Sequence, residues 1–239
     1  MTTPARYITA VSVDWDALDA ASYVRAIPAL ATMGELQIPG NLTFFVGENG
    51  SGKSTLLEAI AAAYGFNPEG GTRNYRFSTY REDEGLAAAT RLARGLERPR
   101  SGYFFRAESF FNVATQATEY WGPGEPSPYG DLHKRSHGES FLDFFEAFDR
   151  AGLYLMDEPE AALSPQRQLV LLSHMAHMAQ AGSQFIVATH SPILLGVPDA
   201  RILSFDDGRI HEVAYEDTES YQVTELFINN RARLLHELL

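Results

Sequence analysis

The stretch Gly47-Glu-Asn-Gly-Ser-Gly-Lys-Ser54 decides the fold of this chain. It fits G-x-x-x-x-G-K-[ST], a loop that wraps phosphate groups between a strand and a helix. Its glycines allow backbone dihedrals that a side chain would forbid, so that successive N–H groups can converge on phosphate oxygens. We expect Lys53 to reach the β- and γ-phosphates and the Ser54 hydroxyl to ligate Mg²⁺. The predicted nucleotide-binding residues are Gly47, Asn49, Gly50, Ser51, Gly52, Lys53, Ser54 and Thr55.

The residues around the loop agree with this interpretation. The apolar run 41–46 predicts a buried strand, and 55–64 predicts a helix whose N-terminus adds its dipole to phosphate binding. Further strands are predicted at 6–13, 152–156, 184–188, within 201–215, and over 34–46 with a break at Pro39-Gly40. Helices are predicted over 137–150, from Ser164 to near Gly182 and over the last twenty residues. This alternation predicts an α/β fold, a mostly parallel sheet flanked by helices with a small helical and irregular lobe.

Composition narrows the class of protein. The chain of 239 residues has no run of 18 apolar residues, so we expect no membrane span. It begins without a basic region followed by an apolar one, so we expect no signal peptide. Cysteine is absent, which suits a cytoplasmic location.

Charge is distributed unevenly along the chain. The formal net charge of −12 makes nucleic acid an unfavourable partner for the molecule as a whole. Residues 73–106 nevertheless contain eight arginines and only four acidic residues. We expect these arginines either to contact a polyanion or an acidic partner, or to pair with the chain's own acids around the nucleotide pocket.

A second group of residues follows the apolar run Leu153-Tyr-Leu-Met156, where Asp157 and Glu158 stand together. The carboxyl end of a buried strand is where α/β proteins bind ligands. We expect Asp157 to hold Mg²⁺, directly or through water, and Glu158 to polarise the water that attacks the γ-phosphate.

Two further segments complete a recognisable order. Ser136-His-Gly-Glu-Ser140 precedes an apolar helical stretch, and Ala188-Thr-His190-Ser-Pro192 follows a predicted strand. The phosphate loop, S-x-G-E, strand-Asp-Glu and Thr-His-Ser-Pro segments together resemble the ABC-type ATPases over about residues 40–205. The S-x-G-E form is closer to the DNA-repair and chromosome-maintenance branch than to the transporter form, S-G-G-Q. More closely, the chain resembles short bacterial predicted ATPases through Gly65-Phe-Asn-Pro-Glu-Gly-Gly71, Arg106-Ala-Glu-Ser-Phe-Phe111 and Glu158-Pro-Glu-Ala-Ala-Leu-Ser-Pro165.

The resemblance implies specific roles. Subunits of ABC-type ATPases sandwich two nucleotides, so ATP and Mg²⁺ are the implied cofactors and a homodimer the implied assembly. Ser136, Gly138 and Glu139 would face the γ-phosphate held by the opposing subunit. His190 matches the switch histidine, which contacts the γ-phosphate and orients the attacking water.

Two positions depart from the pattern of these ATPases. The family usually places a Gln near Mg²⁺, whereas here the strand-like residues 102–107 are followed by Glu108, and Gln116 comes eight residues later. We predict that Glu108 takes this place as a metal ligand.

The residue that contacts adenine is a separate question. Tyr23 either stacks on adenine or is a partly buried core residue.

The sequence therefore predicts one ATPase domain, 1–239, with a signature-bearing lobe inserted at 65–150. We expect an ATP hydrolase whose homodimer drives a conformational switch on a soluble partner, with nucleic acid left open as that partner. A transporter's nucleotide-binding subunit is the first alternative, and the absence of S-G-G-Q disfavours it. A regulatory module with little turnover is the second, and the complete set Lys53, Ser54, Asp157, Glu158 and His190 disfavours it.

Overall fold

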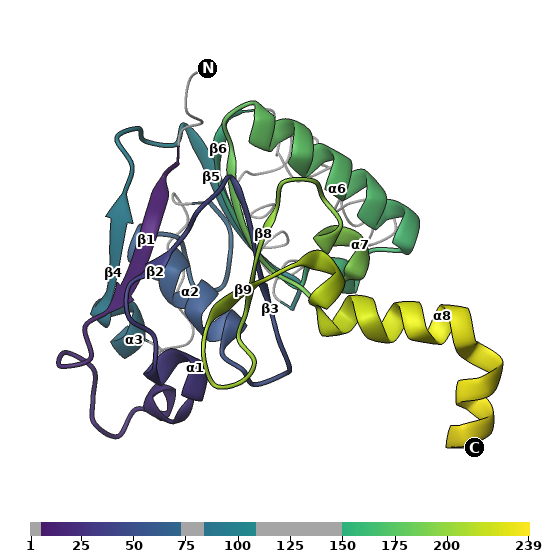
Figure 1. Ribbon diagram of the computed structural model, residues 1–239. Coiled ribbons are helices and arrows are strands. Elements are labelled where there is room, and N and C mark those ends of the chain that lie inside the picture. Colours follow the sequence, from purple (N-terminus) through teal and green to yellow (C-terminus); the bar gives the residue numbers. More distant parts are fainter. Residues whose placement is uncertain (1–5, 73–83, 109–149) are drawn as a thin grey trace, which may run out of the picture.

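The structure is a computed structural model that describes residues 6–72, 84–108 and 150–239 (Figure 1). Its central sheet has six strands in the order β5-β6-β7-β3-β8-β9. The first five run parallel and β9 pairs antiparallel with β8. The strands are β3 (Leu42–Val46), β5 (Ser101–Arg106), β6 (Gly152–Asp157), β7 (Gln184–Ala188), β8 (Arg201–Ser204) and β9 (His211–Val213).

A smaller antiparallel sheet lies beside the central one (Figure 1). It has the order β2-β1-β4 and consists of β1 (Ile8–Val13), β2 (Leu36–Gln37) and β4 (Thr90–Arg94). The segment 65–150 thus contributes β4 to the small sheet and β5 to the central sheet.

Helices fill the layers on both sides of the central sheet. Helix α2 (Lys53–Tyr64) packs between the two sheets, whereas α6 (Pro165–Gln180) and α7 (Pro192–Leu195) cover the other face. The remaining helices are η1 (Tyr23–Ala26), α1 (Pro28–Ala31), α3 (Glu84–Ala89), η3 (Pro159–Ala162), η4 (Tyr215–Asp217) and α8 (Glu219–Leu238). Among the described helices, none is long and apolar enough to cross a membrane.

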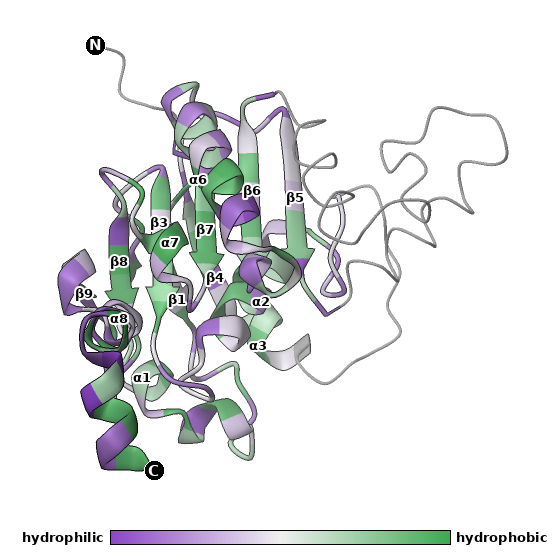
Figure 2. Cartoon of the chain, turned by 90° about the vertical axis from the view of Figure 1, so that its right-hand side faces the viewer, coloured by the Kyte–Doolittle hydropathy of each residue, from purple (hydrophilic) through white to green (hydrophobic). Residues whose placement is uncertain are grey.

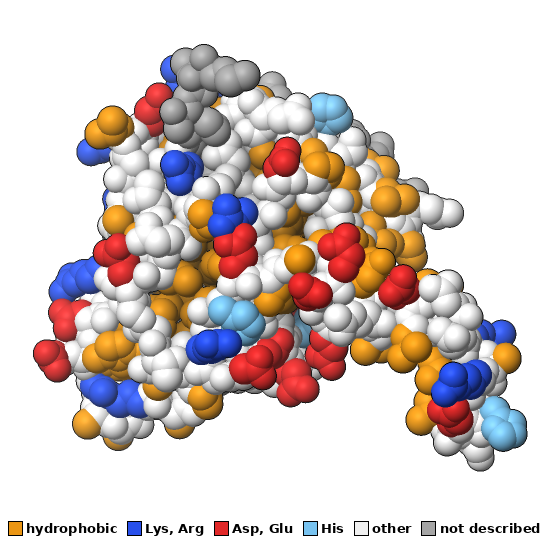
Figure 3. Space-filling view, in the orientation of Figure 1, with side chains coloured by type: hydrophobic (Ala, Val, Ile, Leu, Met, Phe, Trp, Pro, Cys, Tyr) orange, Lys and Arg blue, Asp and Glu red, His pale blue; other side chains and the backbone are white. Residues whose placement is uncertain are grey.

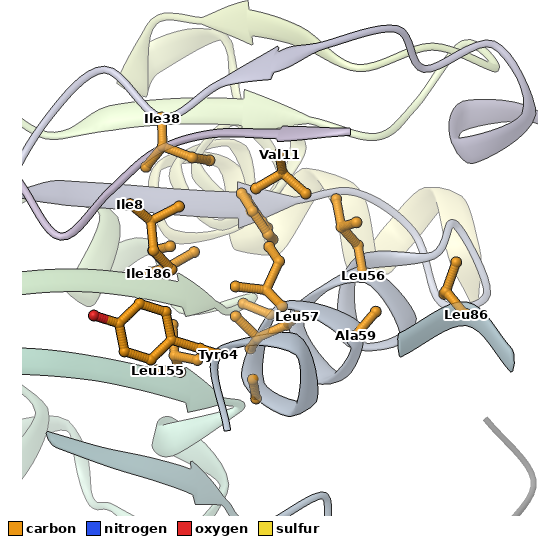
Figure 4. Close-up of a cluster of buried hydrophobic side chains, with 14 of the residues drawn as sticks. Ile8, Val11, Ile38, Leu56, Leu57, Ala59, Tyr64, Leu86, Leu155 and Ile186 are labelled. Atoms are coloured by element: carbon orange, nitrogen blue, oxygen red, sulfur yellow. The ribbon is translucent and has the colours of Figure 1, made fainter. Parts of the chain in front are cut away.

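The hydrophobic core forms two clusters, one on each face of the central sheet. Successive strand residues point to opposite faces, so Phe45 and Leu155 pack under α2 while Phe44 and Met156 pack under α6. Figure 4 shows the first cluster, in which α2 lies between the small sheet and strands of the central sheet. Burial on both faces explains why the three inner strands β3, β6 and β7 are mostly apolar (Figure 2).

The predicted fold class is confirmed, and most predicted elements are present. The break predicted at Pro39-Gly40 is present, because β2 ends at Gln37 and β3 begins at Leu42. Strand β4 and helix α3 were not predicted. The helix predicted over 137–150 lies almost entirely outside the described residues, and the division of the chain at 65–150 stays a prediction.

One buried amide joins the two sheets. Gln184, the first residue of β7, is fully buried. Its Oε1 accepts the backbone N–H groups of Tyr7 and Ile8 at 2.9 Å, and its Nε2 donates to the Ile8 carbonyl at 2.8 Å. The side chain therefore satisfies backbone groups at the start of β1 that would otherwise be buried without partners.

Replacing this amide should destabilise the protein strongly. Gln184→Leu is expected to lower the free energy of unfolding by about 3 kcal/mol or more, because buried backbone groups lose their partners. Urea unfolding measures this value. Gln37→Ala, at an exposed position, is the matched control and should change stability by less than about 0.5 kcal/mol. Equal stability of the two variants would show that the sheets do not depend on Gln184.

Candidate functional site

The loop between β3 and α2 has the backbone that its glycines predict. Gly47, Gly50 and Gly52 have φ angles of 139°, 83° and 102°, all in the region that favours glycine. A Cβ on Gly47 would lie 2.9 Å from Asp206 Oδ1, and one on Gly52 would lie 2.9 Å from Ile27 Cγ2. The loop is thus fixed both by its own dihedrals and by what packs against it.

The N-terminus of α2 is open toward the loop. No side chain caps this helix, and its N-cap residue is Gly52. The Ser51 hydroxyl is buried without a hydrogen-bond partner among the described residues. Uncapped N–H groups and an unpaired hydroxyl beside a glycine loop fit the phosphates of a nucleotide.

Lys53 is held inside the loop. Its side chain is almost fully buried, and Nζ donates to the carbonyls of Gly47 at 2.7 Å and Glu48 at 2.8 Å. Burial lowers the pKa of Lys53, and nearby carboxylates, led by Asp206, oppose that shift. The ammonium group therefore rests on two neutral carbonyl oxygens, which a phosphate could replace as a stronger acceptor.

The loop helix and strand β6 meet at a direct hydrogen bond. Ser54 Oγ donates to Asp157 Oδ1 at 2.8 Å, across 103 positions of sequence. A hydroxyl and a carboxylate oxygen at this separation suit Mg²⁺, which accepts few protein ligands and keeps water or phosphate oxygens for the rest. Among the residues that the structure describes, no group of three His, Asp or Glu side chains could hold a metal ion by itself.

Asp157 is electrostatically unusual. Burial raises the pKa of Asp157 to about 6, and the charges of Glu158 and Glu108 act in the same direction. The Ser54 hydrogen bond and the Arg106 charge only partly oppose the shift. A carboxylate that is costly to ionise here is one that a divalent cation would stabilise.

Glu158 stands next to this pair with a strained backbone. Its φ of 49° and ψ of 51° lie in the left-handed region, which a residue with a side chain seldom adopts. Its N–H donates to the Ala188 carbonyl of β7 at 2.9 Å. The neighbouring strand therefore holds the bend that directs Glu158 away from β6.

A cavity of about 410 Å³ brings these residues together. Its lining includes the loop and the start of α2, together with Glu158, Ile27 and Tyr23. Tyr23 is 53% exposed, so it lies at the surface of this cavity and not in the core. The alternative of a partly buried core residue is therefore wrong, and the other alternative, a contact with adenine, stays a prediction.

His190 lies on the other side of the loop. It follows β7, is exposed, and lines a second cavity that also includes Gly47. Its backbone N–H donates to Glu160 Oε1 at 2.6 Å, and the buried Glu160 Oε2 has no partner among the described residues. The structure thus places His190 at the sheet edge that carries Glu158, but not in the cavity lined by Lys53 and Glu158.

Asp206 is a site residue that the sequence analysis missed. It follows β8, its Oδ1 accepts the Glu48 N–H at 2.9 Å, and its charge acts on Lys53. The signal was present, since Asp206, like Asp157, follows an apolar strand at the same sheet edge.

Glu108 does not bind the Ser54–Asp157 pair directly in this structure. Its side chain is 90% exposed, and Oε2 lies 3.8 Å from Arg106, which pairs more closely with Glu58 at 2.7 Å. Its predicted role as a metal ligand stays a prediction. Ser136, Gly138, Glu139 and Gln116 lie outside the described residues.

Several arginines of the 73–106 segment contact the chain itself. An Arg91 guanidinium nitrogen lies 3.3 Å from Asp14 Oδ2, and the Arg94 guanidinium carbon lies 4.7 Å from the centre of the Tyr64 ring. Arg106 is engaged by Glu58. Arg98 and Arg100 are exposed, and Arg73, Arg76 and Arg81 lie outside the described residues, so both expectations for these arginines stay open.

Removing the Asp157 charge should stabilise the metal-free protein. The folded chain holds the Asp157 proton more tightly than the unfolded chain does. The contribution of this proton to the free energy of unfolding is therefore fully present below pH 3.8 and is lost as pH rises through about 6. At about pH 7.5, Asp157→Asn is therefore expected to raise the free energy of unfolding by about 2 kcal/mol. Urea unfolding at several pH values should show the gain shrinking below pH 6. The exposed Asp16→Asn is the control, and a variant less stable than wild type at every pH would contradict the expected sign.

Two family models of AAA domains match the chain. One matches residues 32–102, which contain the phosphate loop. The other, described as an AAA domain of a putative AbiEii toxin of a type IV toxin–antitoxin system, matches residues 130–196, which contain Asp157, Glu158 and His190. No curated protein matches the chain.

Solved structures with a similar arrangement include three proteins. The SMC head domain from Thermotoga maritima is 16% identical with a TM-score of 0.46, over 87% of this chain and 98% of that one. CbiO1 from Clostridium perfringens, part of an ABC transporter complex, is 16% identical with a TM-score of 0.49, over 97% and 99%. A putative metal-chelate type ABC transporter is 18% identical with a TM-score of 0.42, over 77% and 76%.

The two segments that match AAA domains contain Ser54 and Asp157, which the structure brings together at one sheet edge. The chain is thus similar to AAA domains over these two segments, and it combines a mostly parallel sheet with a glycine loop of the phosphate-binding kind.

Proposed function

We propose that this protein binds ATP with Mg²⁺ and hydrolyses it. The observation that carries the proposal is the Ser54–Asp157 hydrogen bond beside Glu158, at the mouth of the glycine loop. It supports the proposal because a hydroxyl–carboxylate pair suited to Mg²⁺ and a second carboxylate lie beside the loop that would hold the phosphates.

Binding would begin at the loop. The N–H groups at the start of α2 would hold the phosphates, and Lys53 would turn from the carbonyls of Gly47 and Glu48 to the phosphate oxygens. Ser54 and Asp157 would hold Mg²⁺, which when bound neutralises charge on the β- and γ-phosphate oxygens. Asp157 must be ionised for this, so its raised pKa makes nucleotide binding with Mg²⁺ weaken below about pH 6.

Hydrolysis would depend on Glu158. Its carboxylate would accept a proton from the attacking water, and its fixed backbone would keep it at the cavity wall. His190, bonded through its backbone to Glu160, would approach the γ-phosphate from the other side of the loop. Tyr23 would stack on the adenine ring at the outer end of the cavity.

The Glu158 carboxylate is tested by separating binding from turnover. Glu158→Gln should bind ATP with wild-type affinity and lose turnover by about 10²-fold or more, the scale for a removed proton acceptor. Lys53→Ala should weaken binding itself. Calorimetric titration of ATP and the rate of phosphate release measure the two effects. Wild-type turnover in Glu158→Gln would remove this residue from the catalytic role.

We further propose that the active form is a nucleotide-sandwich homodimer that switches a soluble partner. In the described structure the loop cavity is open at the surface, and His190 is exposed at the same edge. Residues Ser136, Gly138 and Glu139 of an opposing copy would close it, as the resemblance to ABC-type ATPases implies.

Nucleotide should therefore strengthen self-association. In Glu158→Gln, Mg-ATP is expected to lower the dissociation constant of the dimer, because the γ-phosphate would bridge two subunits. Light scattering over a range of protein concentrations measures this constant with and without nucleotide. Adding Ser136→Arg should abolish the ATP effect, whereas Ser136→Ala should retain part of it. An association constant that ATP leaves unchanged would count against the sandwich.

A further inference from the structure

Helix α8 projects from the body of the protein with its apolar residues uncovered (Figures 1 and 3). In the described part of the molecule, none of its twenty residues is buried. Its N-terminal end is anchored to the body. The Tyr221 ring packs edge-on against the Tyr215 ring with the ring centroids 4.8 Å apart, and the Tyr215 hydroxyl donates to the Pro192 carbonyl at 2.9 Å. The rest of the helix extends into solvent, although helices of this length gain most of their stability from packing an apolar face.

The helix consists of two legs. Asn230 has non-helical dihedrals, φ −129° and ψ 26°, and separates residues 219–229 from 231–238. Each leg carries one apolar stripe at helical spacing. The first stripe is Val223, Leu226 and Phe227, and the second is Leu234, Leu235 and Leu238.

These two stripes are mirror images along the sequence. Reading forward from Val223 and backward from Leu238 gives the same spacing for the three positions of each stripe, with the centre between residues 230 and 231, whereas Ile228 has no apolar counterpart. A two-fold axis requires such a pattern, because an antiparallel pair of identical helices brings residue i against its counterpart across the centre. Here Val223 would meet Leu238, and Phe227 would meet Leu234.

Charge favours the same orientation. The first leg contains the acids Glu219 and Glu225 and no basic residue, whereas the second contains Arg231 and Arg233 against the single acid Glu237. Antiparallel pairing places the acidic leg of one helix beside the basic leg of the other and opposes their dipoles. Parallel pairing would place like charges and like helix ends together.

We propose that α8 is a self-association element that pairs antiparallel with α8 of a second copy of this chain. Each apolar stripe packs against the other stripe of the partner, and the bend at Asn230 lies at the two-fold axis. The paired surface contains none of the residues of the ATP site, so the pairing requires no nucleotide. It is therefore distinct from the proposed sandwich.

The test measures the mass of the full chain without nucleotide. Wild type is expected to be dimeric at about 100 µM, where a micromolar interface is saturated. Phe227→Asp and Leu234→Lys should each weaken association by about 100-fold or more, because each charge enters two equivalent contacts. Ile228→Asp is the matched control, since Ile228 is 70% exposed on the same helix but belongs to neither stripe.

Mixing the variants determines the register. Phe227→Asp mixed with Leu234→Lys should recover the dimer, because one charged pair and one native pair form in the antiparallel arrangement. Phe227→Asp mixed with Phe227→Lys should not recover it, since that mixture repairs only a parallel pair. Unchanged ATP binding by each single variant would confirm that the body of the protein is folded.

Three results would overturn the proposal. They are a monomeric wild type at this concentration, a control variant as disruptive as Phe227→Asp, and recovery by the parallel mixture only. The ATP effect on association, measured in the Phe227→Asp background, tests the sandwich separately, so either idea can fail without the other.

Discussion

The bond between Ser54 and Asp157 is the contact on which the candidate site depends. It joins the helix that leaves the glycine loop to the strand that ends at Asp157, directly before Glu158, and it does so inside the protein, where Asp157 is almost fully buried. A buried carboxylate is costly unless it is paired, and the Ser54 hydroxyl offsets only part of that cost. The protein therefore holds a destabilised acid at its sheet edge, which a divalent cation would relieve.

The two sheets explain how this bond is held in place. Helix α2 is packed between the central sheet and the small sheet, and Gln184 links those sheets through buried backbone bonds. Gly52 is closed in by Ile27 and Leu30, and the Glu48 N–H is held by Asp206. The loop is thus restrained from α1, from β8 and from its own dihedrals. Such preorganisation lowers the entropy lost when a ligand is ordered.

Much of this arrangement could be predicted from the sequence, for identifiable reasons. Strands β3, β6 and β7 are buried on both faces, so each is a short, mostly apolar run. Strand β3 leads into the glycine loop, and β6 ends at Asp157. Strand β4 was missed because its residues are mostly exposed and two of its five are arginines, which hides the alternation of a half-buried strand. Asp206 and Gln184 were missed as key residues because their roles arise from contacts more than 150 positions away in the sequence. Local pattern carries no information on such contacts.

The central claim is that the loop binds the phosphates of ATP, with Mg²⁺ between Ser54 and Asp157. A crystal structure of the full chain with Mg²⁺ and a non-hydrolysable ATP analogue tests it most directly. We expect Lys53 Nζ to have left the carbonyls of Gly47 and Glu48 for the phosphates, and Mg²⁺ to have replaced the hydrogen bond from Ser54 to Asp157. A nucleotide bound elsewhere, with Lys53 still on its own carbonyls and the Ser54–Asp157 bond intact, would contradict this account.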